Sequence, residues 1–179
     1  MRVLVLGGIR SGKSQWAESV AQQLAGEGER ARVRYVATGP VPEGDADWAT
    51  RVEAHQVRRP AHWQTVETTD LPATLAAAPH VATLVDDIGG WLTATMDRRD
   101  AWAGHPVTGD ITALVDAVAA FPAPLVMVSP EVGLTVVPAT AAGRRFADEL
   151  GTVNQRLAAV CDRVVLVVAG QPVTVKEPT

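Results

Sequence analysis

Short runs of hydrophobic residues alternate along the chain with longer stretches in which hydrophobic residues recur every three or four positions. Runs of four to eight apolar residues, bounded by turn-forming residues, are typical of buried β-strands. These runs predict strands at 2–7, 32–38, 63–67, 81–85, 125–129, 163–169 and 173–176. The last of them is short, and we expect it at the edge of a sheet.

The stretches between the strands carry the spacing of amphipathic helices. Trp16, Val20 and Leu24 lie four residues apart after a glycine-rich turn, and Gly26 and Gly28 follow where a helix should end. Further helices are expected at 45–58, 71–78, 91–98, 108–120 or 110–120, and 140–160. The helix that begins at Thr140 has the clearest apolar stripe.

Strands that alternate with helices predict an α/β protein with an open, mostly parallel sheet and helices on both faces. The 179 residues suit a single domain, 1–179, with one substantial core. In open sheets of this kind, ligands bind beyond the carboxyl ends of the strands. The residues with candidate chemistry follow strands, as this rule requires.

Composition narrows the classes of partner. The net charge of −4 and the pI near 5.5 imply no broad basic surface, so we expect no nucleic acid as a partner. The single cysteine, Cys161, excludes an internal disulfide and a CxxC metal motif, and we expect a buried, inert thiol. No apolar run approaches a membrane span or a signal peptide, so we expect a cytoplasmic protein.

The segment at 7–14 reads GGIRSGKS and matches the phosphate-binding motif GxxxxGK[ST], between a predicted strand and a predicted helix. Glycines allow the backbone to curl so that its N–H groups point at phosphate oxygens, and the helix N-terminus adds positive potential. Lys13 is one of only two lysines in the chain, and we expect it to contact the outer phosphates of ATP or GTP. The Ser14 hydroxyl is a candidate Mg²⁺ ligand.

A P-loop also needs a carboxylate near the metal, commonly at the end of a neighbouring strand. Asp86 follows the apolar run 81–85 and is the first candidate, with Asp87 as the adjacent alternative. Either side chain could instead cap a helix or lie in a loop.

The densest cationic patch lies in and after the predicted helix 45–58. Arg51 and His55 are four residues apart on one helix face, and Arg58 is one turn further. A neutral imidazole is nucleophilic near pH 7, and neighbouring arginines favour that neutral form and stabilise charge on an attacked phosphate. From spacing alone, a solvated helix face with an incidental histidine is the favoured interpretation.

At this point the sequence resembles the bifunctional adenosylcobinamide kinase / adenosylcobinamide-phosphate guanylyltransferase family of cobalamin biosynthesis. The resemblance covers nearly the whole chain. It is carried by LGGIRSGKS at 6–14, RVEAHQVRRPAHWQTVE at 51–67, LVDDIGGWLT at 84–93, VSPEVGLTVVP at 128–138, and the segment 143–170. It implies a RecA-like P-loop fold, a homotrimer, phosphorylation of adenosylcobinamide with ATP or GTP, and transfer of GMP from GTP to adenosylcobinamide phosphate with release of pyrophosphate.

The resemblance also assigns roles to residues. The family pattern R-[IV]-x-x-H-x-x-x-R-P places a GMP–histidine intermediate on His55. Lys13 is the second catalytic residue, and Ser14 and Asp86 would hold Mg²⁺. The implied nucleotide contacts are Gly7, Gly8, Ile9, Arg10, Ser11, Gly12, Lys13, Ser14, Ala37, Thr38, Gly39, Arg58, Arg59, Pro60, Glu67 and Asp86.

Two positions depart from the family pattern. Pro130 stands where many members have asparagine, and proline fixes its own φ and lacks an N–H, so the loop at Glu131 is expected to differ. Ala54 stands where some members have a second histidine, which leaves His55 as the evident nucleophile.

Two other functions remain open from the sequence. A P-loop kinase for another small metabolite would form no covalent nucleotide adduct. A nucleotide-dependent regulatory or motor module would hydrolyse nucleotide slowly and bind a partner, and it would leave the His–Arg–Pro segment unexplained.

Overall fold

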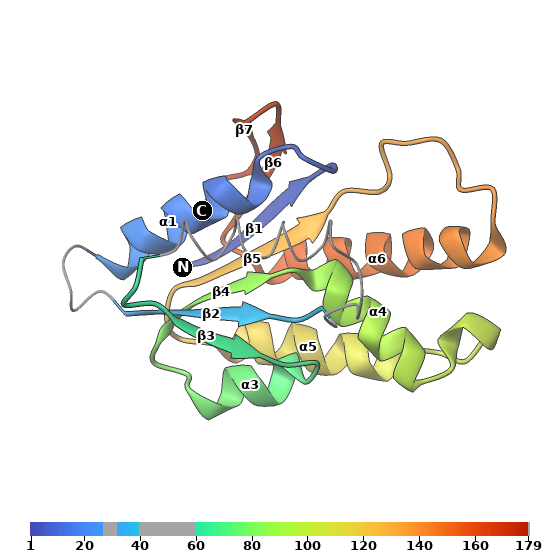
Figure 1. The fold of residues 1–179 in the computed structure, drawn as a ribbon, viewed down its shortest axis with the longest axis horizontal. Coiled ribbons are helices and arrows are strands. Elements are labelled where there is room, and N and C mark those ends of the chain that lie inside the picture. The colour runs from blue at the N-terminus through green and yellow to red at the C-terminus, as the bar shows by residue number, and fades with distance from the viewer. Residues whose placement is uncertain (27–31, 40–59, 179) are drawn as a thin grey trace.

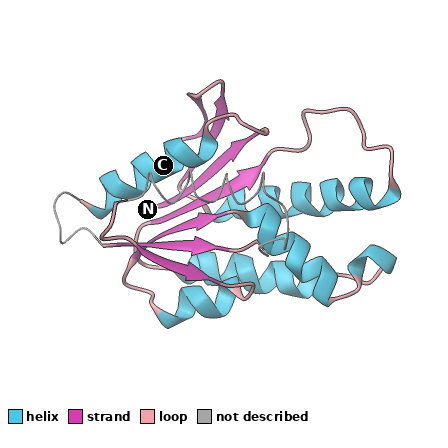
Figure 2. Cartoon of the chain, in the orientation of Figure 1, coloured by secondary structure: helices cyan, strands magenta, loops and turns pink. Residues whose placement is uncertain are grey.

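The computed structural model describes residues 1–26, 32–39 and 60–178, which form one seven-stranded sheet with helices on both faces (Figures 1 and 2). The strands are β1 (Arg2–Gly7), β2 (Val33–Ala37), β3 (Gln64–Glu67), β4 (Ala82–Asp86), β5 (Leu125–Pro130), β6 (Arg163–Val168) and β7 (Gln171–Lys176). The helices are α1 (Lys13–Ala25), α3 (Leu71–Ala77), α4 (Ile88–Arg98), α5 (Thr108–Ala120) and α6 (Ala141–Val160), with a 3₁₀ turn at Ala101–Ala103.

The strand order is β3-β2-β4-β5-β1-β6-β7, and the pairs are parallel except for β6 with β7. The glycine-rich loop follows β1, which lies between β5 and β6, whereas Asp86 ends β4 on the far side of β5. One strand therefore separates the phosphate-loop strand from the strand that ends in the acidic residue, as in RecA-like P-loop proteins. The structure confirms the expected α/β class.

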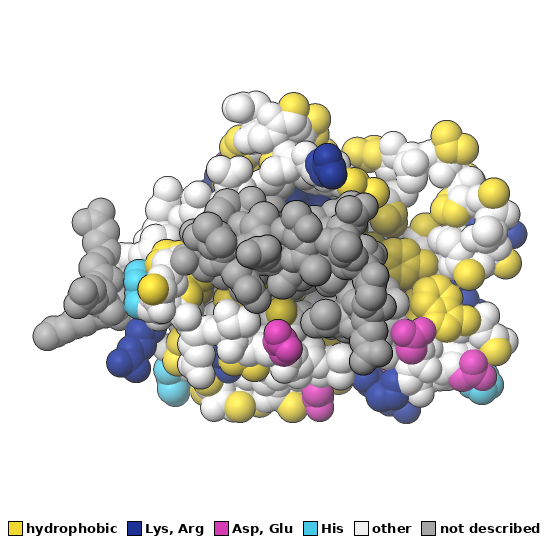
Figure 3. Space-filling model, viewed as in Figure 1, with side chains coloured by type: hydrophobic (Ala, Val, Ile, Leu, Met, Phe, Trp, Pro, Cys, Tyr) yellow, Lys and Arg dark blue, Asp and Glu magenta, His cyan; other side chains and the backbone are white. Residues whose placement is uncertain are grey.

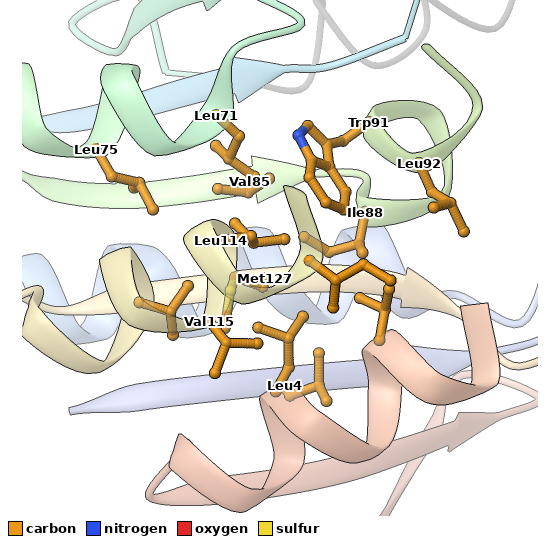
Figure 4. Close-up of a cluster of buried hydrophobic side chains, with 14 of the residues drawn as sticks. Leu4, Leu71, Leu75, Val85, Ile88, Trp91, Leu92, Leu114, Val115 and Met127 are labelled. Carbon is orange, nitrogen blue, oxygen red and sulfur yellow. The ribbon is translucent and has the colours of Figure 1, made fainter. Parts of the chain in front are cut away.

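Alternate residues of β1 face the two sides of the sheet, as the pleat of a strand requires. Val3 and Val5 pack in the smaller apolar cluster under α1, whereas Leu4 packs in the larger cluster formed with α3 to α6. Figure 4 shows part of the larger cluster, to which α4, α5 and β5 contribute Trp91, Leu114 and Met127. Because both faces are buried, the central strands read as continuous hydrophobic runs.

Cys161 follows α6 and is buried, as expected from the sequence. Burial raises the pKa of its thiol to about 12. The thiolate, which is the reactive form, is therefore scarce at neutral pH.

The structure corrects several boundaries. Helix α4 begins at Ile88, three residues before the expected start, because the Asp87 carboxylate accepts a hydrogen bond from the Gly90 N–H at 2.7 Å and caps the helix across two glycines. The last strand begins at Gln171 and forms an antiparallel hairpin with β6, through a turn in which Ala169 and Gly170 have φ of 51° and 76°. The expected loop before α5 contains the 3₁₀ turn.

Candidate active site

The phosphate loop connects the end of β1 to the start of α1 at the carboxyl edge of the sheet (Figure 1). Arg10 and Gly12 have φ of 56° and 91°, so the chain reverses direction through two left-handed residues. Helix α1 starts at Lys13 without an acidic side chain in its first turn and without a side-chain cap. Its positive N-terminus therefore points into the loop and favours an anion there.

Two of the three loop glycines are required by the backbone. A Cβ at Gly7 would lie 2.4 Å from Ser11 Oγ and 2.9 Å from the Val167 carbonyl oxygen. At Gly12, φ is positive and a Cβ would lie 3.1 Å from the Gly170 Cα. At Gly8, in contrast, a Cβ would meet nothing within 4 Å, so the expectation that Gly8 also shapes the turn is not supported by this geometry.

The β6–β7 hairpin braces the loop from outside. The Gly170 N–H donates to the Ser11 carbonyl oxygen at 2.8 Å. Within the loop itself, the Lys13 ammonium donates to the Gly8 carbonyl oxygen at 3.2 Å. Gly170 has no role in the GxxxxGK[ST] motif, and its contribution could not be read from the sequence. Exposed Ile9 forms the tip of the loop with Arg10.

The structure brings the two expected metal ligands together. Ser14 Oγ donates to Asp86 Oδ1 at 3.4 Å, and the Tyr35 hydroxyl donates to Asp86 Oδ2 at 2.8 Å. A hydroxyl and a carboxylate are oxygen ligands, which suit Mg²⁺. Tyr35 lies within β2, and sequence reasoning missed it because it appeared only as one more apolar residue of a buried strand.

The alternative acid, Asp87, has a different environment. Its side chain caps α4, and its carbonyl oxygen accepts a hydrogen bond from the Thr38 hydroxyl. Burial, followed by the nearby charge of Asp86, raises the pKa of Asp87 to about 6, although the Gly90 N–H bond opposes this shift. Asp86 contacts Ser14, and this geometry favours Asp86 as the acid of the phosphate site.

The remaining expected nucleotide contacts lie at or just after the carboxyl ends of neighbouring strands, where they form one row. Ala37 is in register with Asp86 on one side and with Glu67 on the other, so three strand ends meet at the carboxyl edge. Thr38 is buried just after β2, and Gly39 approaches α4 so closely that a Cβ at Gly90 would lie 3.0 Å from its Cα. Glu67 is exposed on the edge strand β3.

Pro60 is the first described residue after a gap, and its carbonyl oxygen accepts a hydrogen bond from the Trp63 N–H at 3.0 Å. His55, Arg58 and Arg59 lie outside the described residues, as do Arg51 and the whole helix expected at 45–58. Their roles stay predictions.

The loop after β5 contacts the phosphate loop directly. The Glu131 N–H donates to the Gly7 carbonyl oxygen at 3.0 Å, and Pro130 is in register with Gly7. The Pro130 carbonyl oxygen accepts a hydrogen bond from the Asn154 side chain at 3.0 Å, so α6 holds the end of β5.

Among the described helices, none is long and apolar enough to cross a membrane.

Comparison with known proteins is consistent with this geometry. Residues 3–175 match the family model described as "Cobinamide kinase / cobinamide phosphate guanyltransferase". The chain is 40% identical over 179 residues to the bifunctional adenosylcobalamin biosynthesis protein CobP of Pseudomonas aeruginosa, with 98% of each chain covered. It is 37% identical over 196 residues to the bifunctional adenosylcobalamin biosynthesis protein CobU of Salmonella typhimurium, with 98% of this chain and 100% of the relative covered.

Solved structures also show a distant likeness, and one example follows. The P4 protein from bacteriophage phi6 in complex with ADP matches 96% of this chain and 53% of its own, with a TM-score of 0.45 and 17% sequence identity.

Proposed function

The chain belongs to the cobinamide kinase / cobinamide phosphate guanyltransferase family, whose model matches residues 3–175, and we propose that it is a bifunctional enzyme with both activities. It phosphorylates adenosylcobinamide with ATP or GTP and then transfers GMP from GTP to adenosylcobinamide phosphate. A single domain carries both reactions. The observation that carries this proposal is the phosphate loop 7–14, with Ser14 3.4 Å from Asp86 across the carboxyl edge of the sheet.

In the kinase reaction, the phosphate loop holds the triphosphate while the hydroxyl of the aminopropanol arm attacks the terminal phosphorus. A new P–O bond forms, the bond to the leaving nucleoside diphosphate breaks, and the hydroxyl proton passes to water. Lys13 and the loop N–H groups stabilise the charge that develops on the phosphate oxygens.

Ser14 and Asp86 are the side chains that would hold Mg²⁺, and Tyr35 orients the Asp86 carboxylate through its 2.8 Å hydrogen bond. The ion, when bound, would neutralise charge on the phosphate oxygens. Magnesium commonly takes one or two protein ligands and completes its coordination with water and substrate phosphates. Among the described residues, no cluster of three His, Cys, Asp or Glu side chains is placed for a metal.

In the guanylyl-transfer reaction, His55 attacks the α-phosphorus of GTP and pyrophosphate leaves. The phosphate of adenosylcobinamide phosphate then attacks the same phosphorus, the P–N bond to His55 breaks, and adenosylcobinamide-GDP is released. Arg51, Arg58 or Arg59 offsets the charge of the leaving pyrophosphate. This role of His55 is supported by the match of 51–60 to the family pattern.

The nucleotide base and ribose lie along the row of strand ends beyond the phosphate loop. Ala37, Thr38, Gly39 and Glu67 provide backbone and carboxylate groups there, and Pro60, which follows the cationic segment in the sequence, also contacts the nucleotide. Support for this placement comes from the register that aligns Ala37 with Glu67 and with Asp86. We further propose a homotrimer that works in the cytoplasm.

Mass spectrometry after incubation with GTP and Mg²⁺ tests the transferase reaction. We expect an acid-labile GMP adduct on the native protein that disappears in His55→Ala and remains in His62→Ala. His62 is a suitable control because it is an exposed histidine seven residues further along the chain. An unmodified native protein, or an adduct that survives in His55→Ala, would contradict the histidine mechanism.

The kinase reaction is tested separately with adenosylcobinamide and ATP labelled in the terminal phosphate. Transfer of label to the corrinoid is expected. If no label is transferred although the protein still binds the nucleotide, the result would favour the alternative function, a P-loop kinase that acts on another substrate.

A further inference from the structure

A groove with a volume of about 460 Å³ lies beside α6, on the side of the sheet opposite α1. One wall is the face of α6, the second is the β5–α6 loop, and the third is formed by β1, β6 and β7. In Figure 1 the loop arches away from the sheet before it returns to the start of α6. Figure 3 shows hydrophobic side chains gathered over this part of the molecule.

The α6 wall is one continuous face of the helix. Arg144, Asp148, Gly151, Gln155 and Ala158 line the groove at spacings of three or four residues. At 1.5 Å per residue, this face is about 21 Å long. The groove is therefore an elongated site, suited to a large flat ligand.

Hydrogen bonds fix all three walls. Arg144 donates to the Pro138 and Ala139 carbonyl oxygens at 3.0 and 2.8 Å, which holds the end of the loop against α6. Lys176 on β7 donates to three carbonyl oxygens at the end of α6, including that of Cys161 at 2.6 Å. The groove is thus built into the fold, as binding sites commonly are.

Asn154 holds the wall nearest the phosphate loop. It is buried, accepts a hydrogen bond from Ser129 Oγ at 2.6 Å and donates to the Pro130 carbonyl oxygen at 3.0 Å. Both partners belong to β5. The end of β5 is therefore fixed relative to α6.

One end of the groove reaches the phosphate loop. Leu6 lines it and directly precedes Gly7, and Glu131 lines it while its N–H bonds to the Gly7 carbonyl oxygen. A ligand in the groove can thus extend a side arm toward the phosphates without leaving the protein surface.

The lining combines exposed apolar residues with polar groups that lack partners. Val136 and Val137 are 87% and 73% exposed, so two adjacent apolar side chains face solvent beside the groove. Among the described residues, the Asp148 carboxylate and the Gln155 amide make no side-chain hydrogen bond. The groove therefore offers apolar contact together with carboxylate, hydroxyl and amide groups.

We propose that this groove binds the corrin ring of adenosylcobinamide and directs its aminopropanol arm to the phosphate loop. The inference rests on the proposed function and identifies the surface that selects its substrate. A corrin ring is a large flat macrocycle with methyl groups and carboxamide arms. The valines contact the methyl groups, and Asp148 and Gln155 bond the carboxamides. The ring lies partly in solvent, because the groove is open.

Gly151 allows a direct test. It lies on the α6 wall, and a Cβ there would meet nothing within 4 Å, so Gly151→Leu fills the groove without disturbing the protein. Leucine also favours a helix more than glycine does, so the variant should fold. Gly109→Leu is the matched control, because Gly109 lies on α5, outside the groove, and its Cβ position is equally open.

The measurement is equilibrium dialysis of adenosylcobinamide, with GTP binding followed in parallel without corrinoid. Gly151→Leu should raise the Kd for adenosylcobinamide at least about tenfold, the scale on which pocket shape discriminates ligands, while GTP affinity stays unchanged. Gly109→Leu should change neither. Sedimentation of both variants reports their oligomeric state.

Three results would overturn the proposal. Unchanged corrinoid affinity in Gly151→Leu would exclude the groove, although the native enzyme would still phosphorylate adenosylcobinamide. A loss of affinity that accompanies a change of oligomeric mass would assign the groove to a second copy of the chain. If the native protein neither binds nor phosphorylates adenosylcobinamide, the proposed function itself fails.

Discussion

The phosphate loop and the groove beside α6 adjoin each other, yet they are built differently. The loop is formed by eight consecutive residues, 7–14, and its shape depends on the main chain, through the left-handed φ values of Arg10 and Gly12. The groove is formed by side chains from five elements and connections that are far apart in the sequence. One region is a local property of the chain and the other is a product of tertiary packing.

This difference explains how two substrates with opposite chemistry can meet at one sheet edge. Main-chain N–H groups and a helix N-terminus suit phosphate, which is common to every nucleotide. Apolar side chains and unpartnered polar groups suit one particular organic shape. Generic and specific recognition are therefore separable by mutation.

The largest effect is expected from Lys13→Ala, which breaks the phosphate site alone. Removal of a positioned cation that stabilises transferring phosphate should lower kcat by about 10²–10³-fold, the scale measured for one such group in other enzymes. Adenosylcobinamide affinity should remain unchanged in dialysis, because Lys13 does not line the groove. A parallel loss of corrinoid affinity would mean that the two regions are one site.

The second effect comes from Asn154→Ala, which alters the groove side. The variant leaves the buried Ser129 hydroxyl and the Pro130 carbonyl oxygen without their partner, so the free energy of unfolding should fall by about 1–3 kcal/mol. Gln155→Ala is the control, since that neighbour is exposed and should change stability by less than about 0.5 kcal/mol. Urea denaturation measures both, and equal changes in the two variants would refute the role of Asn154.

The third compares two glycines of the phosphate loop. Gly12→Ala places a side chain at a φ of 91° and close to Gly170, and should lower the free energy of unfolding by about 1–2 kcal/mol. Gly8→Ala meets nothing within 4 Å and should leave stability within about 0.5 kcal/mol of the native value. Thermal denaturation without nucleotide distinguishes the two, and similar losses would show that both glycines shape the backbone.

The smallest effect is expected at the amino edge of the sheet, opposite the phosphate loop. Arg2 donates to Asp162 at 3.0 Å, and its hydrogen bonds lower the pKa of that carboxyl. A lowered folded-state pKa stabilises the protein above the unfolded-state pKa, and this contribution is lost as the pH falls through the folded-state value. Asp162→Asn should cost about 0.2–1 kcal/mol at pH 7 and converge with the native protein in acid. A constant difference at all pH values would exclude an ionic cause.

Much of the phosphate site could be predicted from sequence because its determinants are contiguous. The motif at 7–14 fixes loop and helix start together, and the position of Asp86 after an apolar run identified it before its contact with Ser14 was known. Tyr35 was missed because a hydroxyl on a buried strand residue gives no signal until its neighbour strand is placed. Helix α4 was expected too late, because Gly89 and Gly90 lower helix propensity while the Asp87 cap restores it.

The groove could not be predicted by the same reasoning. Leu6, Glu131, Gly151 and Val175 are separated by long stretches of chain and share a surface only because β7 turns back beside β6 and α6 crosses behind the sheet. The GLTVV run at 133–137 looked like part of a family segment, and its exposure was not evident from hydrophobicity alone. His55, in contrast, was identified from a sequence motif alone. The residue lies outside the part of the chain that the structure describes, so its role stays a prediction.

The central claim is that residues 7–14 hold the triphosphate with Mg²⁺ between Ser14 and Asp86. A crystal structure of the protein with Mg²⁺ and a non-hydrolysable GTP analogue tests it directly. The account predicts outer phosphates within hydrogen-bond distance of Lys13 Nζ and the loop N–H groups, and a metal ion that contacts Ser14 Oγ on the side facing Asp86. Phosphates bound elsewhere, with an empty loop, would contradict it.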